Sequence, residues 1–310
     1  MVRDQKVYVI GAGLIGASWT AIFIFHGWSV HVVDPAQDAL EKLQPAVSQA
    51  LLALRAVTPK APADLGEITV SPELPDQMTD AAWVQENGPE DLAWKRAVLA
   101  DIDRRTPSNV VIASSTSSLL ASDMQIDCER AERVLVAHPF NPPHLIPLVE
   151  VVPGAKTASW AVDAAMEFYA RLGKKPVRVK KEVPGHLANR LASAVYREAV
   201  HMVGEGIADV ADIDAAMAYG PGLRWAIMGP HMTYHLGGGE GGIAQYLEHL
   251  GDSQEERWKH LGNTPLSQDV RQKIIAGVLE EAGGRTLNDL AAERDICLVE
   301  LLKVFASNRT

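Results

Sequence analysis

Short apolar runs and longer stretches of helical spacing alternate along the first part of the chain. Lys6–Ile10 and Ser29–Val33 are two such runs, and each has the length of a strand. Short continuous apolar runs bounded by turn residues are typical of strands that are buried on both faces of a parallel sheet. Six later runs predict further strands: Glu67–Val70, Trp83–Glu86, Val110–Thr116, Arg133–Ala137, Ile146–Val152 and Pro176–Lys180.

Apolar residues at helical spacing fill the intervals between most of these runs. They predict helices over Ala17–His26, Leu40–Leu54, Asp91–Arg104 and Thr157–Leu172, with a proline-containing turn over Thr58–Asp64. Strands that alternate with helices in this way are typical of α/β proteins with a doubly wound sheet. We therefore expect a Rossmann-type fold with a mostly parallel sheet.

The pattern changes after the helix-breaking cluster Val183–Gly185. His186–Gly204 and Ile207–Met217 have helical spacing, and no later run has the quality of the earlier strands. A chain of 310 residues also exceeds the usual size of a single core. The sequence therefore predicts two domains, an α/β domain over residues 1–183 and an all-α domain over residues 184–310.

Composition and charge narrow the class of protein. The chain has 47% hydrophobic and 22% charged residues, which is ordinary for a soluble enzyme, and it lacks an apolar run of the roughly 18 residues that a membrane helix needs. Its net charge of -10 disfavours nucleic acid or an anionic membrane as a partner. Cys128 and Cys297 lack metal-ligand spacing, which favours a reducing cytoplasm and predicts neither a disulfide framework nor a metal site.

A glycine-rich motif lies between the first two predicted strands. Gly11 suits the tight turn, Gly13 lets a pyrophosphate approach the backbone, and Gly16 lets the following helix pack closely. A glycine turn alone would leave the acidic Asp34 unexplained, whereas its carboxylate can bind ribose hydroxyls and repel the extra phosphate of NADP. The motif therefore predicts NAD as cofactor, with contacts from Gly11, Gly13, Leu14, Ile15, Gly16 and Asp34.

His138 follows a buried apolar run and opens a loop that three prolines stiffen. Open parallel sheets hold their ligands at such strand ends. Twelve residues later, the apolar run Ile146–Val152 carries a lone carboxylate, Glu150, which is costly to bury without a partner. The pattern predicts that His138 is a general base oriented by Glu150, although a packed or solvated histidine would give the same local pattern. Asn141, in the same loop, is a candidate cofactor contact.

Other polar residues follow neighbouring predicted strands. Glu90 and Lys95 lie at a helix start, where they could contact the cofactor ribose and the substrate, although an exposed pair is the simpler interpretation. Ser114–Ser118 consists of small hydroxyl residues, and at least one is expected to cap the next helix. Ser117 is the candidate donor to a substrate oxygen and also a candidate cofactor contact. Asn189 begins the first helix of the second domain, where its amide can reach back toward the site.

Four motifs resemble those of the L-3-hydroxyacyl-CoA dehydrogenase family, and the resemblance covers nearly the whole chain. They are Gly11–Gly16, Ser114–Leu119, His138–Pro142 with Leu148–Glu150, and Val183–Arg190. The resemblance implies that His138 takes the hydroxyl proton and that Glu150 orients it. It implies that Ser117 and Asn189 bind the substrate oxygen. It also implies a homodimer formed through the C-terminal helical domain, and NAD contacts that include Glu90 and Lys95.

Departures from the family pattern indicate a small substrate. The acyl-CoA members carry lysines after the second strand, because several CoA phosphates need counter-charges. In this chain the segment between Asp34 and Glu67 has only three basic residues, Lys42, Arg55 and Lys60. The chain is more similar to a branch with small substrates, which includes L-carnitine dehydrogenase, L-gulonate 3-dehydrogenase and lambda-crystallin.

Residues Leu223–Gly242 are most similar to the carnitine enzymes. Arg224 could bind a carboxylate, while Trp225 and Tyr234 could face a trimethylammonium group or simply pack between helices. Gly237–Gly242 is expected to be a loop tip. The sequence thus predicts NAD-dependent oxidation of the L-3-hydroxyl of a small 3-hydroxycarboxylate, of the L-carnitine or L-gulonate type, to the 3-keto acid. One alternative is a short-chain L-3-hydroxyacyl-CoA dehydrogenase. The other is a non-catalytic NAD-binding protein of the lambda-crystallin type. The second is disfavoured because the serine, histidine, glutamate and asparagine positions of the family are all filled.

Overall fold

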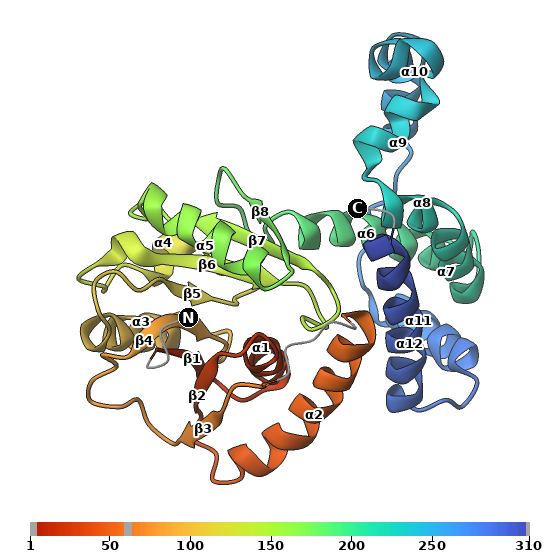
Figure 1. Cartoon of the computed structure of the whole chain (residues 1–310). Coiled ribbons are helices and arrows are strands. Elements are labelled where there is room, and N and C mark those ends of the chain that lie inside the picture. Colours follow the sequence, from red (N-terminus) through yellow and green to blue (C-terminus); the bar gives the residue numbers. More distant parts are fainter. Residues whose placement is uncertain (1–4, 59–63, 308–310) are drawn as a thin grey trace. The chain divides into compact units, whose positions relative to one another are not determined.

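The computed structural model describes residues 5–58 and 64–307 (Figure 1). Its contacts divide the chain into two compact units, which are considered separately. The first consists of Met1–Arg190 with Ala292–Thr310, and the second of Leu191–Ala291. The boundary predicted after residue 183 lies a few residues before this division and stays a prediction.

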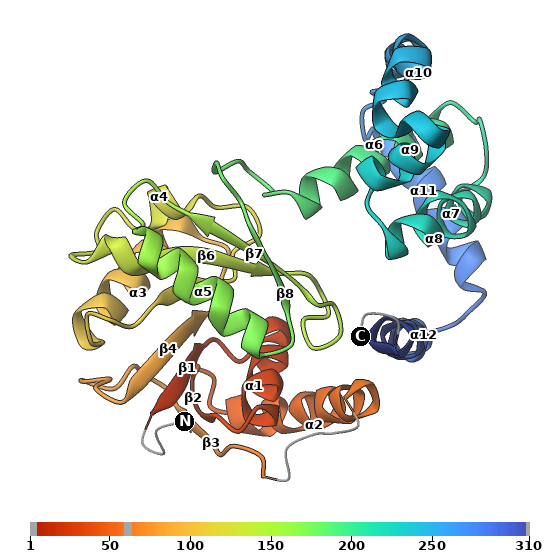
Figure 2. The same cartoon turned by 45° about the horizontal axis from the view of Figure 1, so that its top comes forward.

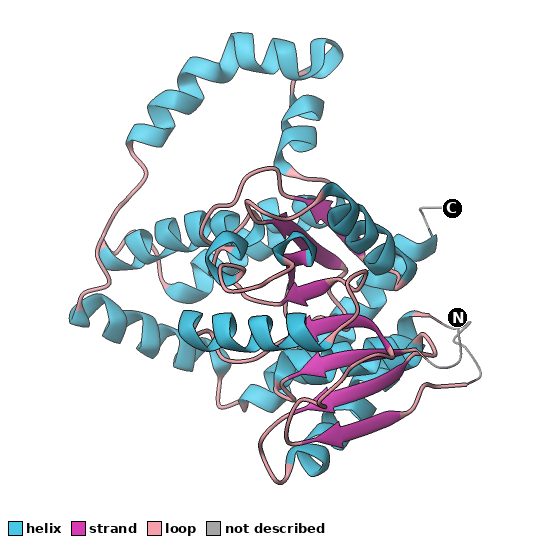
Figure 3. Ribbon diagram, turned by 90° about the vertical axis from the view of Figure 1, so that its left-hand side faces the viewer, coloured by secondary structure: helices cyan, strands magenta, loops and turns pink. Residues whose placement is uncertain are grey.

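An eight-stranded sheet organises the first unit, and Figure 3 shows its strands side by side in magenta. The strand order is β3-β2-β1-β4-β5-β6-β7-β8, and every neighbouring pair is parallel except β6 and β7. The loop between β6 and β7 is too short for a crossover helix, so β7 returns antiparallel to β6. The strands are β1 Lys6–Ile10, β2 Ser29–Val33, β3 Ile68–Ser71, β4 Ala81–Glu86, β5 Ile112–Ser114, β6 Val134–Pro139, β7 Leu148–Pro153 and β8 Lys175–Arg178.

Helices cover both faces of this sheet and enclose two apolar cores. Helices α1, α2 and α5 pack on one face, where the core includes Trp19, Leu43 and Phe168. Helices α3 and α4 pack on the other, where the core includes Leu99 and Met124 (Figure 2). The predicted Rossmann-type fold is confirmed. The helices are α1 Leu14–Phe25, α2 Ala39–Val57, α3 Leu92–Arg105, α4 Ala121–Met124 and α5 Ser159–Arg171.

The C-terminal part of the chain is helical, as predicted, and the described residues after β8 contain no strand. Helix α6 begins in the first unit and continues into the second, and α12 begins in the second unit and ends in the first. The helices are α6 Ala188–Gly204, α7 Val210–Tyr219, α8 Pro221–Ile227, α9 Pro230–Gly237, α10 Gly242–Lys259, α11 Gln268–Ala282 and α12 Leu287–Ser307.

Some local predictions need correction. Strand β5 is shorter than the predicted Val110–Thr116. The predicted loop tip Gly237–Gly242 contains instead the end of α9, a short 3-10 helix over Gly239–Gly241 and the first residue of α10. Most of the predicted turn Thr58–Asp64, residues 59–63, lies outside the described residues. Over residues 5–58 and 64–307, none of the helices is long and apolar enough to cross a membrane.

Candidate active site

The antiparallel pairing of β6 and β7 places His138 directly opposite Glu150. The Nδ1 atom of His138 lies 2.8 Å from Oε2 of Glu150. The Glu150 side chain has no exposed surface and His138 has little. The carboxylate that looked costly in an apolar strand therefore has its partner, as predicted. When Nδ1–H donates to Glu150, the lone pair of the imidazole is on Nε2, which is the protonation state that a general base needs.

The second oxygen of Glu150 is held by the start of α6. Its Oε1 accepts hydrogen bonds from the backbone N–H groups of Leu187 at 2.7 Å and Ala188 at 2.9 Å. Burial alone would raise the pKa of the Glu150 carboxyl, but the hydrogen bonds from His138 and from these amides outweigh it, so the pKa lies below its usual range. Glu150 therefore remains ionised and fixed beside the imidazole.

This lowered pKa makes a testable contribution to folding stability. A carboxyl whose pKa is lower in the folded state stabilises the fold above its unfolded pKa of about 4.3, and the contribution is lost as the pH falls through the folded value. We expect the difference in the free energy of unfolding between wild type and Glu150→Gln to be larger at pH 7 than below about pH 4. Urea denaturation across that range measures it, with Glu167→Gln, at an exposed carboxylate of α5, as the control. A difference that is independent of pH would contradict the prediction.

One cavity of about 380 Å³ brings most of the predicted catalytic residues together. The amide Nδ2 of Asn189 donates to the carbonyl oxygen of Ser117 at 3.4 Å, so these two residues lie side by side. The cavity therefore offers an imidazole, a hydroxyl and an amide to a single ligand. Its lining residues include Ile15, Glu90, Lys95, Ser115, Ser117, His138, Asn141 and Asn189.

The hydroxyl-rich segment Ser114–Ser118 does not cap the next helix as predicted. The residue before α4 is Leu120, and no side chain caps that helix. Instead, Oε1 of Glu90 accepts hydrogen bonds from Thr116 Oγ1 at 2.6 Å and from Ser118 Oγ at 2.9 Å. Burial raises the pKa of Glu90, but these hydroxyls and the nearby Lys95 charge outweigh it and lower the pKa overall. The segment is thus arranged around a carboxylate.

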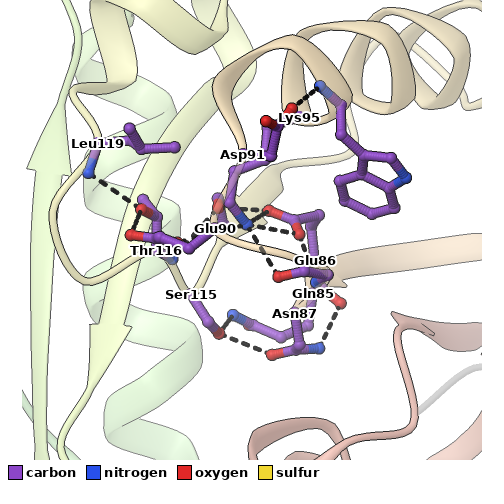
Figure 4. A network of polar contacts seen from close by, with 12 residues as sticks. Gln85, Glu86, Asn87, Glu90, Asp91, Lys95, Ser115, Thr116 and Leu119 are labelled. Atoms are coloured by element: carbon purple, nitrogen blue, oxygen red, sulfur yellow. Dashed lines mark hydrogen bonds and ion pairs between the residues drawn. The ribbon is translucent and has the colours of Figure 1, made fainter.

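Lys95 is buried, which rules out the exposed pair that was the simpler interpretation of Glu90 and Lys95. Only 1% of its side chain is exposed, and its Nζ lies 2.8 Å from Oε1 of Glu86 and 3.9 Å from Oε2 of Glu90 (Figure 4). Sequence reasoning missed Glu86, which is fully buried in β4 and also accepts a hydrogen bond from Ser114 at 2.5 Å. The signal was the same as at Glu150, a carboxylate in a buried strand.

His186 is a further residue beside the site that the sequence did not reveal. Its ring centre lies 5.3 Å from that of His138, and its backbone has a φ of +49°, which is unusual for a residue other than glycine. Its Nε2 lies 3.3 Å from the carbonyl oxygen of Thr116, whereas Nδ1 is buried without a hydrogen-bond partner in the described chain. Burial and the adjacent His138 lower the pKa of His186, so its ring stays neutral.

A second cavity, of about 660 Å³, lies at the glycine-rich motif, and Gly11, Gly13 and Asp34 line it. A Cβ atom on Gly16 would lie 1.9 Å from the carbonyl oxygen of Gly11, whereas nothing lies within 4 Å of one on Gly13. The absence of a side chain at Gly16 therefore permits close packing of α1, and the open space at Gly13 leaves room for a pyrophosphate. Asp34 accepts a hydrogen bond from the Ala12 amide at 2.7 Å. The residues present therefore fit NAD. Of the other predicted contacts in the motif, Ile15 lines the smaller cavity, whereas Leu14 and Gly16 line neither.

The three predicted substrate residues belong to the second unit. Arg224 and Trp225 lie in α8 and Tyr234 lies in α9. The ring of Tyr234 packs on Tyr246 of α10 with ring centres 4.8 Å apart. This contact fits the packing interpretation of Tyr234, and the substrate role of all three residues stays a prediction.

Comparison with known proteins identifies the family. Residues 6–183 match the NAD-binding domain of 3-hydroxyacyl-CoA dehydrogenase, and residues 185–281 match its C-terminal domain. The chain belongs to the 3-hydroxyacyl-CoA dehydrogenase family. It is an NAD-dependent dehydrogenase, as the sequence predicted.

Several similar proteins have names that state their activity. L-carnitine dehydrogenase from Streptomyces griseus is 46% identical, with 96% of this chain and 89% of the relative covered. L-carnitine dehydrogenase from Bacillus cereus is 40% identical, with coverages of 97% and 92%. The solved structure of 5-formyl-3-hydroxy-2-methylpyridine 4-carboxylic acid 5-dehydrogenase, an NAD+-dependent dismutase, is 28% identical with a TM-score of 0.83 and covers 99% of both chains.

Proposed function

We propose that this enzyme oxidises the 3-hydroxyl group of L-carnitine to the ketone, with NAD as the hydride acceptor and His138 as the general base. The buried hydrogen bond between His138 and Glu150, in a cavity that Ser117 and Asn189 also line, is the observation that carries the chemistry. Relatives named L-carnitine dehydrogenase at 40–46% identity support the choice of substrate.

Each polar group of the cavity has a defined task in this reaction. Nε2 of His138 removes the proton of the substrate hydroxyl, and Oε2 of Glu150 stabilises the imidazolium that results. Ser117 Oγ and Asn189 Nδ2 donate hydrogen bonds to the substrate oxygen, where charge develops during the reaction. NAD, when bound, supplies the redox chemistry.

The tail of the substrate is assigned to the second unit. Arg224 can bind a carboxylate through two parallel N–H donors. The trimethylammonium cation is assigned to Trp225 and Tyr234, because aromatic rings attract such a cation. L-carnitine carries both groups, whereas L-gulonate and 3-hydroxybutyrate carry only the carboxylate.

A substrate panel tests this proposal. NADH formation is followed by absorbance with L-carnitine, L-gulonate and 3-hydroxybutyrate, and NADH consumption is followed with acetoacetyl-CoA. We expect the highest kcat/KM with L-carnitine. Activity on the thioester alone would overturn the assignment to small substrates, and binding of NADH without turnover of any compound would favour a structural protein.

Asp34 should set the preference for NAD over NADP. Its carboxylate lines the nucleotide cavity, where it can bind ribose hydroxyls and repel a 2′-phosphate. We expect Asp34→Asn to weaken NADH binding about tenfold or more, because a hydrogen bond to a charged group is lost, and to weaken NADPH binding much less. Fluorescence titration measures both, with Asp38→Asn, at a partly exposed aspartate that does not line the cavity, as the control. An unchanged ratio of the two dissociation constants would remove Asp34 from this role.

We also propose that the enzyme forms a homodimer through its C-terminal helices. Helices α8 and α9 have no buried residue, and Leu223, Ile227 and Leu236 are each exposed by 58–63%. Exposed apolar surface on this scale marks a protein interface. We expect wild type to sediment as a dimer and Leu236→Glu to raise the dimer dissociation constant at least about tenfold, because a charge is then buried. The control is Leu52→Glu, an exposed leucine of α2. A wild-type monomer would contradict the assignment.

The cytoplasm is the proposed location. Cys128 is buried and Cys297 is exposed, and both are free thiols. An exposed free thiol is typical of a reducing compartment.

A further inference from the structure

Asn87 lies where the two cavities of the first unit meet. It follows β4 directly, and together with Gly88 it lines both the nucleotide cavity of Asp34 and the catalytic cavity of His138. A dinucleotide that reaches from one cavity into the other must therefore pass Asn87. Its side chain is only partly buried, so part of it faces this passage.

A buried hydrogen-bond network fixes the orientation of the groups behind Asn87. Trp83 Nε1 donates to Gln85 Oε1 at 3.3 Å, and the Tyr169 hydroxyl donates to the same atom at 2.5 Å. An indole N–H can only donate, so the atom that it contacts must be the oxygen of the Gln85 amide. The amide nitrogen of Gln85 therefore points the other way, toward Ser115.

The Ser115 hydroxyl lies between the amides of Gln85 and Asn87, so the orientation of one amide fixes that of the other (Figure 4). Its Oγ accepts from Gln85 Nε2 at 2.9 Å and from Trp19 Nε1 at 3.2 Å, which uses both lone pairs of the hydroxyl. The Ser115 O–H must then donate, and its acceptor is Oδ1 of Asn87 at 2.7 Å. A flipped Asn87 amide would place N–H groups against that hydroxyl hydrogen. The Asn87 amide therefore has one orientation.

In that orientation, Asn87 presents a hydrogen-bond donor to the passage between the cavities. One N–H of its Nδ2 donates to the backbone oxygen of Gln85 at 2.9 Å. The second N–H has no acceptor among the residues that the structure describes. We infer that this N–H binds an oxygen of the ribose that joins the pyrophosphate of NAD to its nicotinamide.

The assignment of this N–H to the second ribose follows from the order of groups in NAD. It rests on the proposed function, in which Asp34 and His138 lie at opposite ends of the bound NAD. Asp34 takes the adenosine ribose and the glycine-rich motif takes the pyrophosphate. His138 marks the nicotinamide end, so the second ribose is the part that passes Asn87. The Asn87 amide is held by the half-buried Ser115 and by the backbone of the buried Gln85, so this donor is preorganised and binding requires no reorientation.

Binding of cofactor fragments tests the inference without measuring turnover. The dissociation constants of AMP, ADP, ADP-ribose and NADH are measured by calorimetry for wild type and Asn87→Ala. We expect ADP-ribose and NADH to bind roughly five- to tenfold more weakly to the variant, which is the scale of one neutral hydrogen bond. AMP and ADP, which lack the second ribose, should bind as to wild type.

Other outcomes would overturn the inference. Equal weakening of all four ligands would indicate damage to the fold, and a loss that already occurs with ADP would indicate a pyrophosphate contact. Unchanged binding of all four would leave Asn87 without this role. The exposed Asn109→Ala is the matched control, and Asn87→Ser, which keeps a small donor, gives a second variant in case alanine impairs folding. Binding of AMP and NADH to wild type tests whether NAD occupies the proposed site. A failure of that proposal would appear in wild type, whereas a failure of the Asn87 inference would appear only in the comparison with the variant.

Discussion

Replacing His138 by glutamine should lower kcat roughly 100-fold or more while NADH binds almost as to wild type, because general-base catalysis commonly contributes a factor of this size. The imidazole lies 2.8 Å from Glu150 and lines the cavity of about 380 Å³ that Ser117 and Asn189 also line. Glutamine keeps a polar side chain of similar length but cannot take up the proton. Steady-state kinetics with the best substrate of the panel and fluorescence titration with NADH measure the two effects.

Controls separate this role from a general loss of structure. Glu150→Gln should also lower kcat, because the neutral amide does not stabilise an imidazolium. His260→Gln, at an exposed histidine after α10, should change neither kcat nor NADH binding. Unaltered turnover in His138→Gln would remove the residue from its role.

The sheet and the pairing of His138 with Glu150 were predictable because local patterns determine them. Short apolar runs identified all eight strands, and the order of glycines and Asp34 identified the nucleotide end of the sheet. His138 and Glu150 could be paired because a lone carboxylate in a buried strand needs a partner nearby. Their antiparallel register adds the geometry, which comes from the short loop between β6 and β7.

The polar network behind the cavities could not be predicted, because its members come from separate elements. Ser115 contacts Trp19 of α1 and Gln85 of β4, and Tyr169 of α5 contacts Gln85 from the other face of the network. No sequence spacing marks these contacts. The capping role expected for the hydroxyl segment failed for the same reason, since Glu90, from another loop, binds those hydroxyls.

The second unit was predictable as helical but not in its packing. Among its described residues, Val200, Ile213 and Val270 are the buried apolar residues with large side chains. Helical spacing indicates that a face is apolar, but the sequence does not say which molecule covers that face. The roles proposed for Arg224, Trp225 and Tyr234 depend on that packing.

A large loss of folding stability is expected when the buried ion pair at the start of β6 is broken. Arg133 directly precedes β6, and both it and Asp103 of α3 are fully buried. Arg133 Nη2 lies 2.6 Å from Asp103 Oδ1, and it also donates to the backbone oxygen of Asp103 at 2.6 Å. Asp103→Ala would leave the guanidinium buried without its counter-charge. We expect the free energy of unfolding to fall by about 3–5 kcal/mol, as is usual when one partner of a buried ion pair is removed.

Urea denaturation of three variants separates the buried charge from the helix that carries it. Asp101 lies two residues earlier in α3 and pairs with Arg105 at the surface, so Asp101→Ala should cost less than about 1 kcal/mol. The double variant Asp103→Leu with Arg133→Met removes both charges, and it should be markedly more stable than Asp103→Ala because no unpaired charge is then buried. Equal losses in the two aspartate variants would contradict the argument. So would a double variant as unstable as Asp103→Ala, because the loss would then come from packing rather than from the unpaired guanidinium.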